Sequence, residues 1–534
     1  MRILFFFAIL VLAVGLPGSA QARWLEASSD HFVVYADDSE KDLRAFTQQL
    51  ERYDAAMGFL FNDRAAKPSP SNRVTIYVVK NERDVRKLLG NGAKNVAGFY
   101  VPRAGASVAF VPKIDVQSRE TDRSMLILLH EYAHHFLISN SSFPMPAWMS
   151  EGAAEFYASA SFNKDGGVSL GRPAQHRAYE LYNDGGLTVE QILSTPRNDR
   201  SRSFSAFYGK SWLLYHYLML SGDRTGQIRK YGQALQNGLP LRDAAVEAFG
   251  DLDQLEKDVG KYLSRRRMNV IQLSGEKIDI GPVQIRTLGN GEADMMPVRI
   301  TSKSGVTREQ ALELLSDARE IAADYPGDAA VLAALAEAEF DAGFDDRAIA
   351  AADGALAIDP KRVNAYVQKG YAMFRKAENA DDREAAFAEA VKPFVALNKI
   401  ENDHPLPLIY FYRSYMERGA KPSELAVRGL DWASQLARFD LGLRFMLARQ
   451  DLLDRDFARA RANLIPVAYN PHGGALASQA RAVLDALEKI GDPEQLARMM
   501  AASPETDMQT GGDREGENGE EDGETGDALS STPR

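Results

Sequence analysis

The stretch MLILLHEYAHH occupies residues 125–135 and places three histidines directly after an apolar run. His130 and His134 are four positions apart, so on a helix both imidazoles lie on one face, where they can share one metal ion. Glu131 lies beside them, where a carboxylate can take a proton from a water molecule at that ion. The apolar run indicates that the helix is buried. Burying these histidines and this glutamate without a partner would cost free energy, so the pattern favours a bound metal ion.

A third ligand is predicted in PAWMSEGAAEF, residues 146–156, where a second helix is expected to begin near Pro146. The candidates in this helix are Glu151 and Glu155, which lies one turn further along the same face. One carboxylate can bind the metal while the other holds a ligand histidine from behind. By spacing alone Glu155 stays open as the competing ligand. Two histidines and one glutamate leave a fourth position for water, as catalysis requires.

The composition limits the kind of protein and the kind of metal site. With 534 residues the chain is expected to form two or more domains, and its 45% apolar and 26% charged residues are typical of globular proteins. It contains no cysteine, which excludes disulfides, catalytic thiols, thiolate ligands and a lipid anchor on cysteine. Any metal site must therefore use histidine and carboxylate ligands, and Zn²⁺ is the expected cofactor.

The N-terminal residues 1–22 have the pattern of a secretory signal peptide. Arg2 precedes an apolar segment, Ile3–Leu16, and Ala20-Gln21-Ala22 fits a cleavage site. The apolar segment is shorter than the roughly 20 residues that a spanning helix needs. The sequence therefore predicts export to the periplasm or beyond, with no membrane span after cleavage.

Residues 501–534 are predicted to form a disordered acidic tail. From Pro504 onward the tail carries ten acidic and two basic residues, and it accounts for most of the chain's net charge of −11. The rest of the chain is close to neutral, so nothing indicates a nucleic-acid partner.

Residues 23–270 alternate between strand-like and helix-like patterns. Strands are predicted at 31–36 and 73–79, a helix at 40–60 and a hairpin at 97–112, with mostly helical structure from residue 121. Strands first and helices afterwards indicate an α+β domain. Residues 271–305 are predicted to be a β-rich linker that ends this domain.

Residues 306–500 are rich in alanine and predicted to be helical, with an internal repeat. At an offset of 34 residues, Pro326 matches Pro360, Ala338 matches Ala372 and Phe340 matches Phe374. The segment RAIAAADGALAIDP, with Ala348, Ala355 and Pro360, resembles a tetratricopeptide repeat. The resemblance implies an all-α solenoid of four to five helix-turn-helix units. A helical bundle without repeats is the alternative.

HEYAHH followed by WMSEGAAE resembles the gluzincin, or peptidase MA-like, zinc peptidases. The resemblance covers residues 24–270, and its specific part lies within 124–160. It implies a zincin-like fold with a small mixed sheet and active-site helices. It also implies that His130, His134 and Glu151 bind zinc and that Glu131 is the general base. In related enzymes the gap before the ligand glutamate is slightly longer than here.

Two further features bear on catalysis and specificity. A donor for the oxyanion is expected opposite Glu131, and the candidates are Tyr208 first and His216 second. The segment GASVAF (105–110) lies where related aminopeptidases carry a glutamate that grips the substrate's amino terminus, and it has no acidic residue. An enzyme that is not an aminopeptidase is therefore expected.

The remaining histidines are interpreted as packing or surface residues. This interpretation treats His31, His176, His404 and His472 as isolated. It also assigns His135 to the core or to the surroundings of the ligands, because its side chain points about 100° away from that of His134 on a helix.

The leading hypothesis is an exported zinc metallopeptidase whose repeat domain recruits a protein partner or the peptide or protein substrate. Its rival is a non-catalytic envelope adaptor that acts through the repeats, with a vestigial peptidase fold. The intact Glu131 argues against the rival hypothesis, because a site without catalytic activity needs no general base. A purely structural zinc domain is the weakest alternative because an open ligand position is left.

Overall fold

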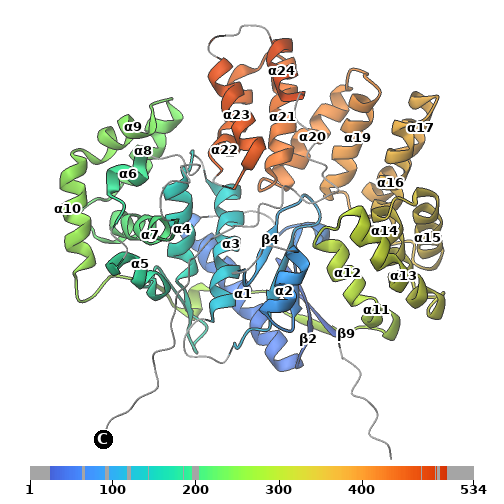
Figure 1. Ribbon diagram of the computed structural model, residues 1–534, viewed down its shortest axis with the longest axis horizontal. Coiled ribbons are helices and arrows are strands. Elements are labelled where there is room, and N and C mark those ends of the chain that lie inside the picture. Colours follow the sequence, from blue (N-terminus) through green and yellow to red (C-terminus); the bar gives the residue numbers. More distant parts are fainter. Residues whose placement is uncertain are drawn as a thin grey trace, which may run out of the picture.

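The computed structural model describes residues 24–62, 67–90, 96–116, 122–141, 143–183, 186–194, 204–470, 472–487, 489 and 493–501. The predicted signal peptide lies outside these residues, as does the predicted acidic tail apart from residue 501. The described chain forms an α+β part with a mixed sheet, followed by a long series of helices (Figure 1). The predicted α+β class of the N-terminal part is confirmed.

Six strands form the main sheet in the order β4-β5-β3-β2-β1-β9. They are β1 (Trp24–Ser28), β2 (Phe32–Asp37), β3 (Val74–Val79), β4 (Phe99–Val101), β5 (Val108–Pro112) and β9 (Gln284–Thr287). β2, β3 and β5 run parallel to one another, while β4, β1 and β9 pair antiparallel with their neighbours. The strands and the hairpin predicted for this region are confirmed, and β4 forms one edge of the sheet.

A second, small antiparallel sheet contains β6 (Ser161–Phe162), β7 (Val168–Leu170) and β8 (Ile271–Leu273). Both β8 and β9 come from the predicted linker, and they pair with strands of the N-terminal part. The linker continues into α11 (Asn290–Asp294) and α12 (Met296–Lys303). Met296 and Ile300 of α12 pack against Tyr35 and Tyr77 of the main sheet. The segment that joins the two parts of the chain is thus built into the first.

The helices of the N-terminal part contact both faces of the main sheet: Leu43 shares a core with Val34 and Ile76, whereas Leu88 packs against the cluster that contains Tyr35 and Tyr77. They are α1 (Glu40–Phe61), α2 (Glu82–Leu89), α3 (Arg123–Asn140), α4 (Ala147–Ala158), α5 (Ala178–Asn183), α6 (Val189–Ser194), α7 (Phe204–Leu220), α8 (Gln227–Gln236), α9 (Leu241–Phe249) and α10 (Leu252–Leu263), with 3-10 turns at Pro70–Asn72, Gln175–Arg177 and Gly275–Lys277. The side chain of Asp122 caps α3 by accepting from the Ser124 N–H. Helix α3 packs against α4, and α4 against α7.

The C-terminal part is a series of helices that pack against their neighbours along the chain. They are α13 (Arg308–Asp324), α14 (Ala329–Asp341), α15 (Asp345–Ile358), α16 (Val363–Glu378), α17 (Arg383–Ala390), α18 (Lys392–Ile400), α19 (Pro405–Glu417), α20 (Glu424–Leu436), α21 (Leu441–Leu453), α22 (Phe457–Ala468), α23 (Gly474–Leu487) and α24 (Pro493–Ala501). The matched pairs Ala338/Ala372 and Phe340/Phe374 are all buried, in α14 and α16 respectively. In Figure 1 this series runs from the main sheet to α21–α24, which stand above α3 and α4.

Candidate metal centre

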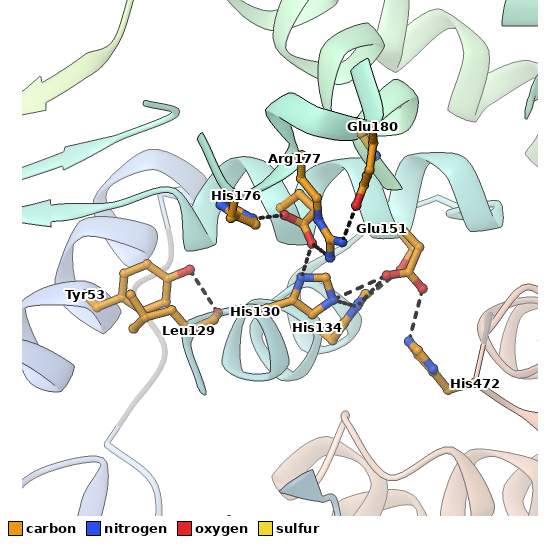
Figure 2. Close-up of polar contacts among 12 residues, drawn as sticks. Tyr53, Leu129, His130, His134, Glu151, His176, Arg177, Glu180 and His472 are labelled. Atoms are coloured by element: carbon orange, nitrogen blue, oxygen red, sulfur yellow. Dashed lines mark hydrogen bonds and ion pairs between the residues drawn. The ribbon is translucent and has the colours of Figure 1, made fainter. Parts of the chain in front are cut away.

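Helix α3 brings the two predicted ligand histidines together. The Nε2 atoms of His130 and His134 are 3.1 Å apart, and their side chains are only 13% and 8% exposed. Helix α4 places Glu151 against both rings: its Oε2 atom lies 3.3 Å from each Nε2, and its side chain is fully buried. The three donor atoms therefore form a nearly equilateral triangle (Figure 2).

The size of this triangle fits a metal ion. Ligands at about 2.0–2.1 Å from a tetrahedral ion lie about 3.3 Å from one another. The observed separations of 3.1–3.3 Å match that value, and the three residues could hold a metal. The structure thus places Glu151 with the two histidines as a possible third ligand.

The charges in the cluster also favour a cation. Although burial opposes ionisation of Glu151, the nearby His472 and His134 hold the pKa of its carboxyl group well below the usual range. Burial lowers the pKa of His130, but the interactions of its ring with Glu151 and Glu155 outweigh burial and raise the pKa well above the usual value. An ionised carboxylate buried among imidazoles stabilises positive charge between the donor atoms.

Glu155 lies behind the ring of His130 instead of beside the other donors. Its Oε1 atom is 3.3 Å from His130 Nδ1, the ring nitrogen that faces away from Glu151. The Glu155 carboxylate also pairs with His176 Nε2 and Arg177 Nη2, each at 2.7 Å. A carboxylate on Nδ1 fixes the tautomer and the orientation of a ligand histidine. Glu155 is therefore placed to support His130.

His134, the other histidine of the candidate centre, has a corresponding partner that was not predicted from the sequence. Ser150 Oγ lies 3.2 Å from His134 Nδ1, and both side chains are buried. With Nδ1 engaged on each ring, both Nε2 atoms are directed toward the same point. Its position directly before Glu151 was the only sequence signal that could have pointed to Ser150.

Two of the histidines interpreted as isolated are in fact part of the centre. His176 holds Glu155, as described above. His472, from the loop between α22 and α23, lies with Nε2 3.1 Å from Glu151 Oε1, and its ring centroid is 5.1 Å from that of His134. The isolated interpretation of these two residues is wrong, because tertiary packing brings together residues that carry no common sequence pattern.

Glu131 faces a large cavity beside the cluster. A cavity of about 930 Å³ is lined by Glu131, His134 and His472, by β4, and by residues of the C-terminal helices. Glu131 is half-buried at this wall. The carboxylate is therefore placed next to the predicted ligands and open to a space that a substrate could enter.

The two candidates for an oxyanion donor lie in different surroundings. The ring centroid of Tyr208 is 6.3 Å from that of His130, and the Arg177 guanidinium lies 4.9 Å above the Tyr208 ring. His216 is fully buried, and its two ring nitrogens bond to Tyr262 Oη and the Gly171 carbonyl at 2.9 Å each. Only Tyr208 is brought close to the metal centre.

His135 belongs to the packing around the ligands. Its Nδ1 atom lies 2.6 Å from Tyr100 Oη, and its ring stacks against Tyr132 and contacts Phe439 of the C-terminal part. Burial lowers the pKa of His135 to about 3, so the ring is neutral at ordinary pH. This placement agrees with its predicted assignment to the core or the surroundings of the ligands.

A second group that could hold a metal contains His31, Glu51 and Asp54. The backbone N–H and Nδ1 of His31 bond to the two oxygens of Glu51 at 2.8 and 2.9 Å. Asp54 accepts a 2.6 Å hydrogen bond from Tyr132 Oη. These contacts satisfy the group as an ion pair between α1 and the start of β2, so we assign it a structural role.

Among the helices of the described residues, none combines the length and apolar character needed to cross a membrane. Comparison with protein-family models gave no match to the chain, and comparison with curated proteins gave none either.

Proposed function

We propose that the chain is a zinc-dependent peptidase of the gluzincin type. The observation that carries the proposal is the triangle of donor atoms from His130, His134 and Glu151, with edges of 3.1–3.3 Å, beside Glu131 on the cavity wall. Two imidazoles and one carboxylate are a ligand set that suits catalytic zinc, and the chain offers no thiolate alternative.

The residues around the centre would divide the work of peptide hydrolysis. Zinc bound here would polarise the scissile carbonyl and lower the pKa of a water molecule. Glu131 would take the proton from the attacking water and pass it to the leaving amine. Tyr208 would donate a hydrogen bond to the oxyanion of the tetrahedral intermediate. Glu155 and Ser150 would keep the two ligand rings in place through their Nδ1 atoms.

The substrate would bind as an extended chain along β4. Phe99, Tyr100 and Val101 of this edge strand line the cavity. An edge strand offers backbone donors and acceptors with which an extended peptide can pair. No acidic residue occurs in 104–110 to grip a free amino terminus, so an endopeptidase is favoured over an aminopeptidase.

The C-terminal helices would form a solenoid of the tetratricopeptide type that presents the substrate or recruits a protein partner. Their contribution to the cavity supports this role: Phe340 of α14 and Val367 and Tyr371 of α16 lie on its wall. Because the N-terminal residues resemble a signal peptide, the enzyme would act in the periplasm or outside the cell.

The test combines metal analysis with cleavage of an unbiased peptide library. The wild type, Glu131→Gln and the matched control Glu389→Gln, which alters an exposed carboxylate of α17, are compared with and without a chelator. We expect all three proteins to bind one zinc ion, and only Glu131→Gln to lose cleavage. A wild type without zinc, or a Glu131→Gln variant that cleaves as fast as the wild type, would refute the proposal.

A further inference from the structure

The two oxygens of Glu151 face different parts of the chain. Oε2 lies 3.3 Å from the Nε2 atoms of both His130 and His134, whereas Oε1 lies 3.1 Å from Nε2 of His472. Among the described residues, the group of donors within 4.8 Å of one another contains His130, His134 and Glu151, and His472 is outside it (Figure 2). His472 is therefore placed to hold the carboxylate from behind.

His472 and Gly473 are both hydrogen bonded to Asn470. The backbone N–H of His472 donates to Asn470 Oδ1 at 3.2 Å, and the Gly473 N–H donates to the Asn470 carbonyl at 3.3 Å. A Cβ atom on Gly473 would lie 2.6 Å from the Cβ of Ala477, so only glycine fits at this point of the turn. His472, held to Asn470 in this way, reaches Glu151 of α4.

The position of His472 also depends on how the C-terminal helices dock. Asp440, just before α21, accepts a 2.9 Å hydrogen bond from the Ala104 N–H in the β4–β5 turn. Glu401, after α18, accepts from the N–H and the hydroxyl of Ser71, both at 2.9 Å. These contacts hold the two parts of the chain together.

From the 3.1 Å contact between the His472 imidazole and the Glu151 carboxylate we infer that His472 pairs with Glu151, so that the C-terminal domain completes the metal centre. The inference rests on the proposed function, since it concerns the same metal. A partner that orients a ligand raises metal affinity, and its loss typically lowers affinity about 10–100-fold. Linkage makes the effect reciprocal: docking of the C-terminal domain strengthens metal binding, and bound metal strengthens docking to the same extent.

The test measures zinc affinity of the full chain by competition with a chromophoric chelator. His472→Phe keeps a ring of similar size but removes the donor, whereas His472→Gln keeps an N–H donor of similar reach. Because the side chain is 32% exposed and lies in a loop, both variants are expected to fold, which circular dichroism checks. We expect His472→Phe to bind zinc about 10–100-fold more weakly than the wild type, and His472→Gln to stay within a few-fold of it.

A second readout, amide hydrogen exchange, separates this role from simple packing. Added zinc should slow exchange in α21 and at the start of α23 in the wild type, and should not do so in His472→Phe. If both variants bind zinc as tightly as the wild type, the inference is overturned while the proposed function stands. If the wild type binds no zinc, the proposed function itself fails.

Discussion

Replacing Gly152 by alanine should push apart helices α4 and α7 beside the candidate metal centre. Gly152 directly follows Glu151 in α4, where α4 packs against α7. A Cβ atom at this position would lie 2.4 Å from the carbonyl oxygen of Ser211 and 3.1 Å from Cβ of Tyr215. The closest of these neighbours is backbone, which cannot rotate away as a side chain can. Helix α7 would have to move, and Tyr208 would move with it.

The magnitude follows from two opposing effects. Forcing extra volume into a well-packed site costs about 1–3 kcal/mol, and the short distance to a backbone atom favours the upper end. Alanine is intrinsically better than glycine in a helix interior by about 1 kcal/mol. We therefore expect Gly152→Ala to lower the free energy of unfolding by roughly 2 kcal/mol.

The assay is urea unfolding of the full chain, followed by tryptophan fluorescence, to which Trp148 in α4 and Trp212 in α7 contribute. The matched control is Gly260→Ala in α10, where nothing lies within 4 Å of the added Cβ. The control should unfold at the same urea concentration as the wild type or at a slightly higher one. If Gly152→Ala were as stable as this control, the argument from α4–α7 packing would be refuted.

Three other predictions concern the surroundings of the centre. Glu155→Gln should lower zinc affinity about 10–100-fold in chelator competition, because His130 loses the charge behind its ring, and an unchanged affinity would contradict this role. Tyr208→Phe should lower kcat for peptide cleavage about 100-fold or more with zinc content unchanged, and an unaltered kcat would rule out the oxyanion role. Burial opposes protonation of His31, but Glu51 and Asp54 outweigh it and raise its pKa to about 9 from 6.5. The stability that this ion pair contributes is therefore complete below pH 6.5 and is lost as the pH rises through 9. Between these two pH values the free energy of unfolding of the wild type should fall by on the order of 2–3 kcal/mol, and that of His31→Gln should not. Urea unfolding at both pH values measures the difference.

The parts of the centre that lie on one helix could be predicted from the sequence. Helix geometry alone places His130 and His134 on one face of α3. Pro146 marks the start of α4, so the place of Glu151 within its own helix could also be predicted. Spacing alone could not decide between Glu151 and Glu155, because the outcome depends on how α4 crosses α3, and only the resemblance favoured Glu151. The spacing of residues along the sequence does not determine the crossing angle between two helices.

The contribution of His472 was beyond sequence reasoning for a different reason. It belongs to the second half of the chain, and it reaches Glu151 only because the C-terminal helices return to α3 and α4. A single histidine in a loop carries no periodic signal. The strands, by contrast, were predictable because β-branched and aromatic runs such as those of β2 and β3 have a strong local preference for extended structure.

The pairing of β9 with β1 has a consequence for the order in which the protein can mature. As the chain is synthesised, β1 is made more than 250 residues before its outer neighbour β9, which spans residues 284–287. Until then the edge of β1 remains open, and an open edge is a template for pairing with other chains. During the synthesis of the residues between the predicted metal ligands and β9, the edge of β1 is therefore exposed although every predicted ligand has already been made. A variant in which β9 pairs with β1 more slowly should aggregate more during synthesis than the wild type, even when the folded protein is equally stable.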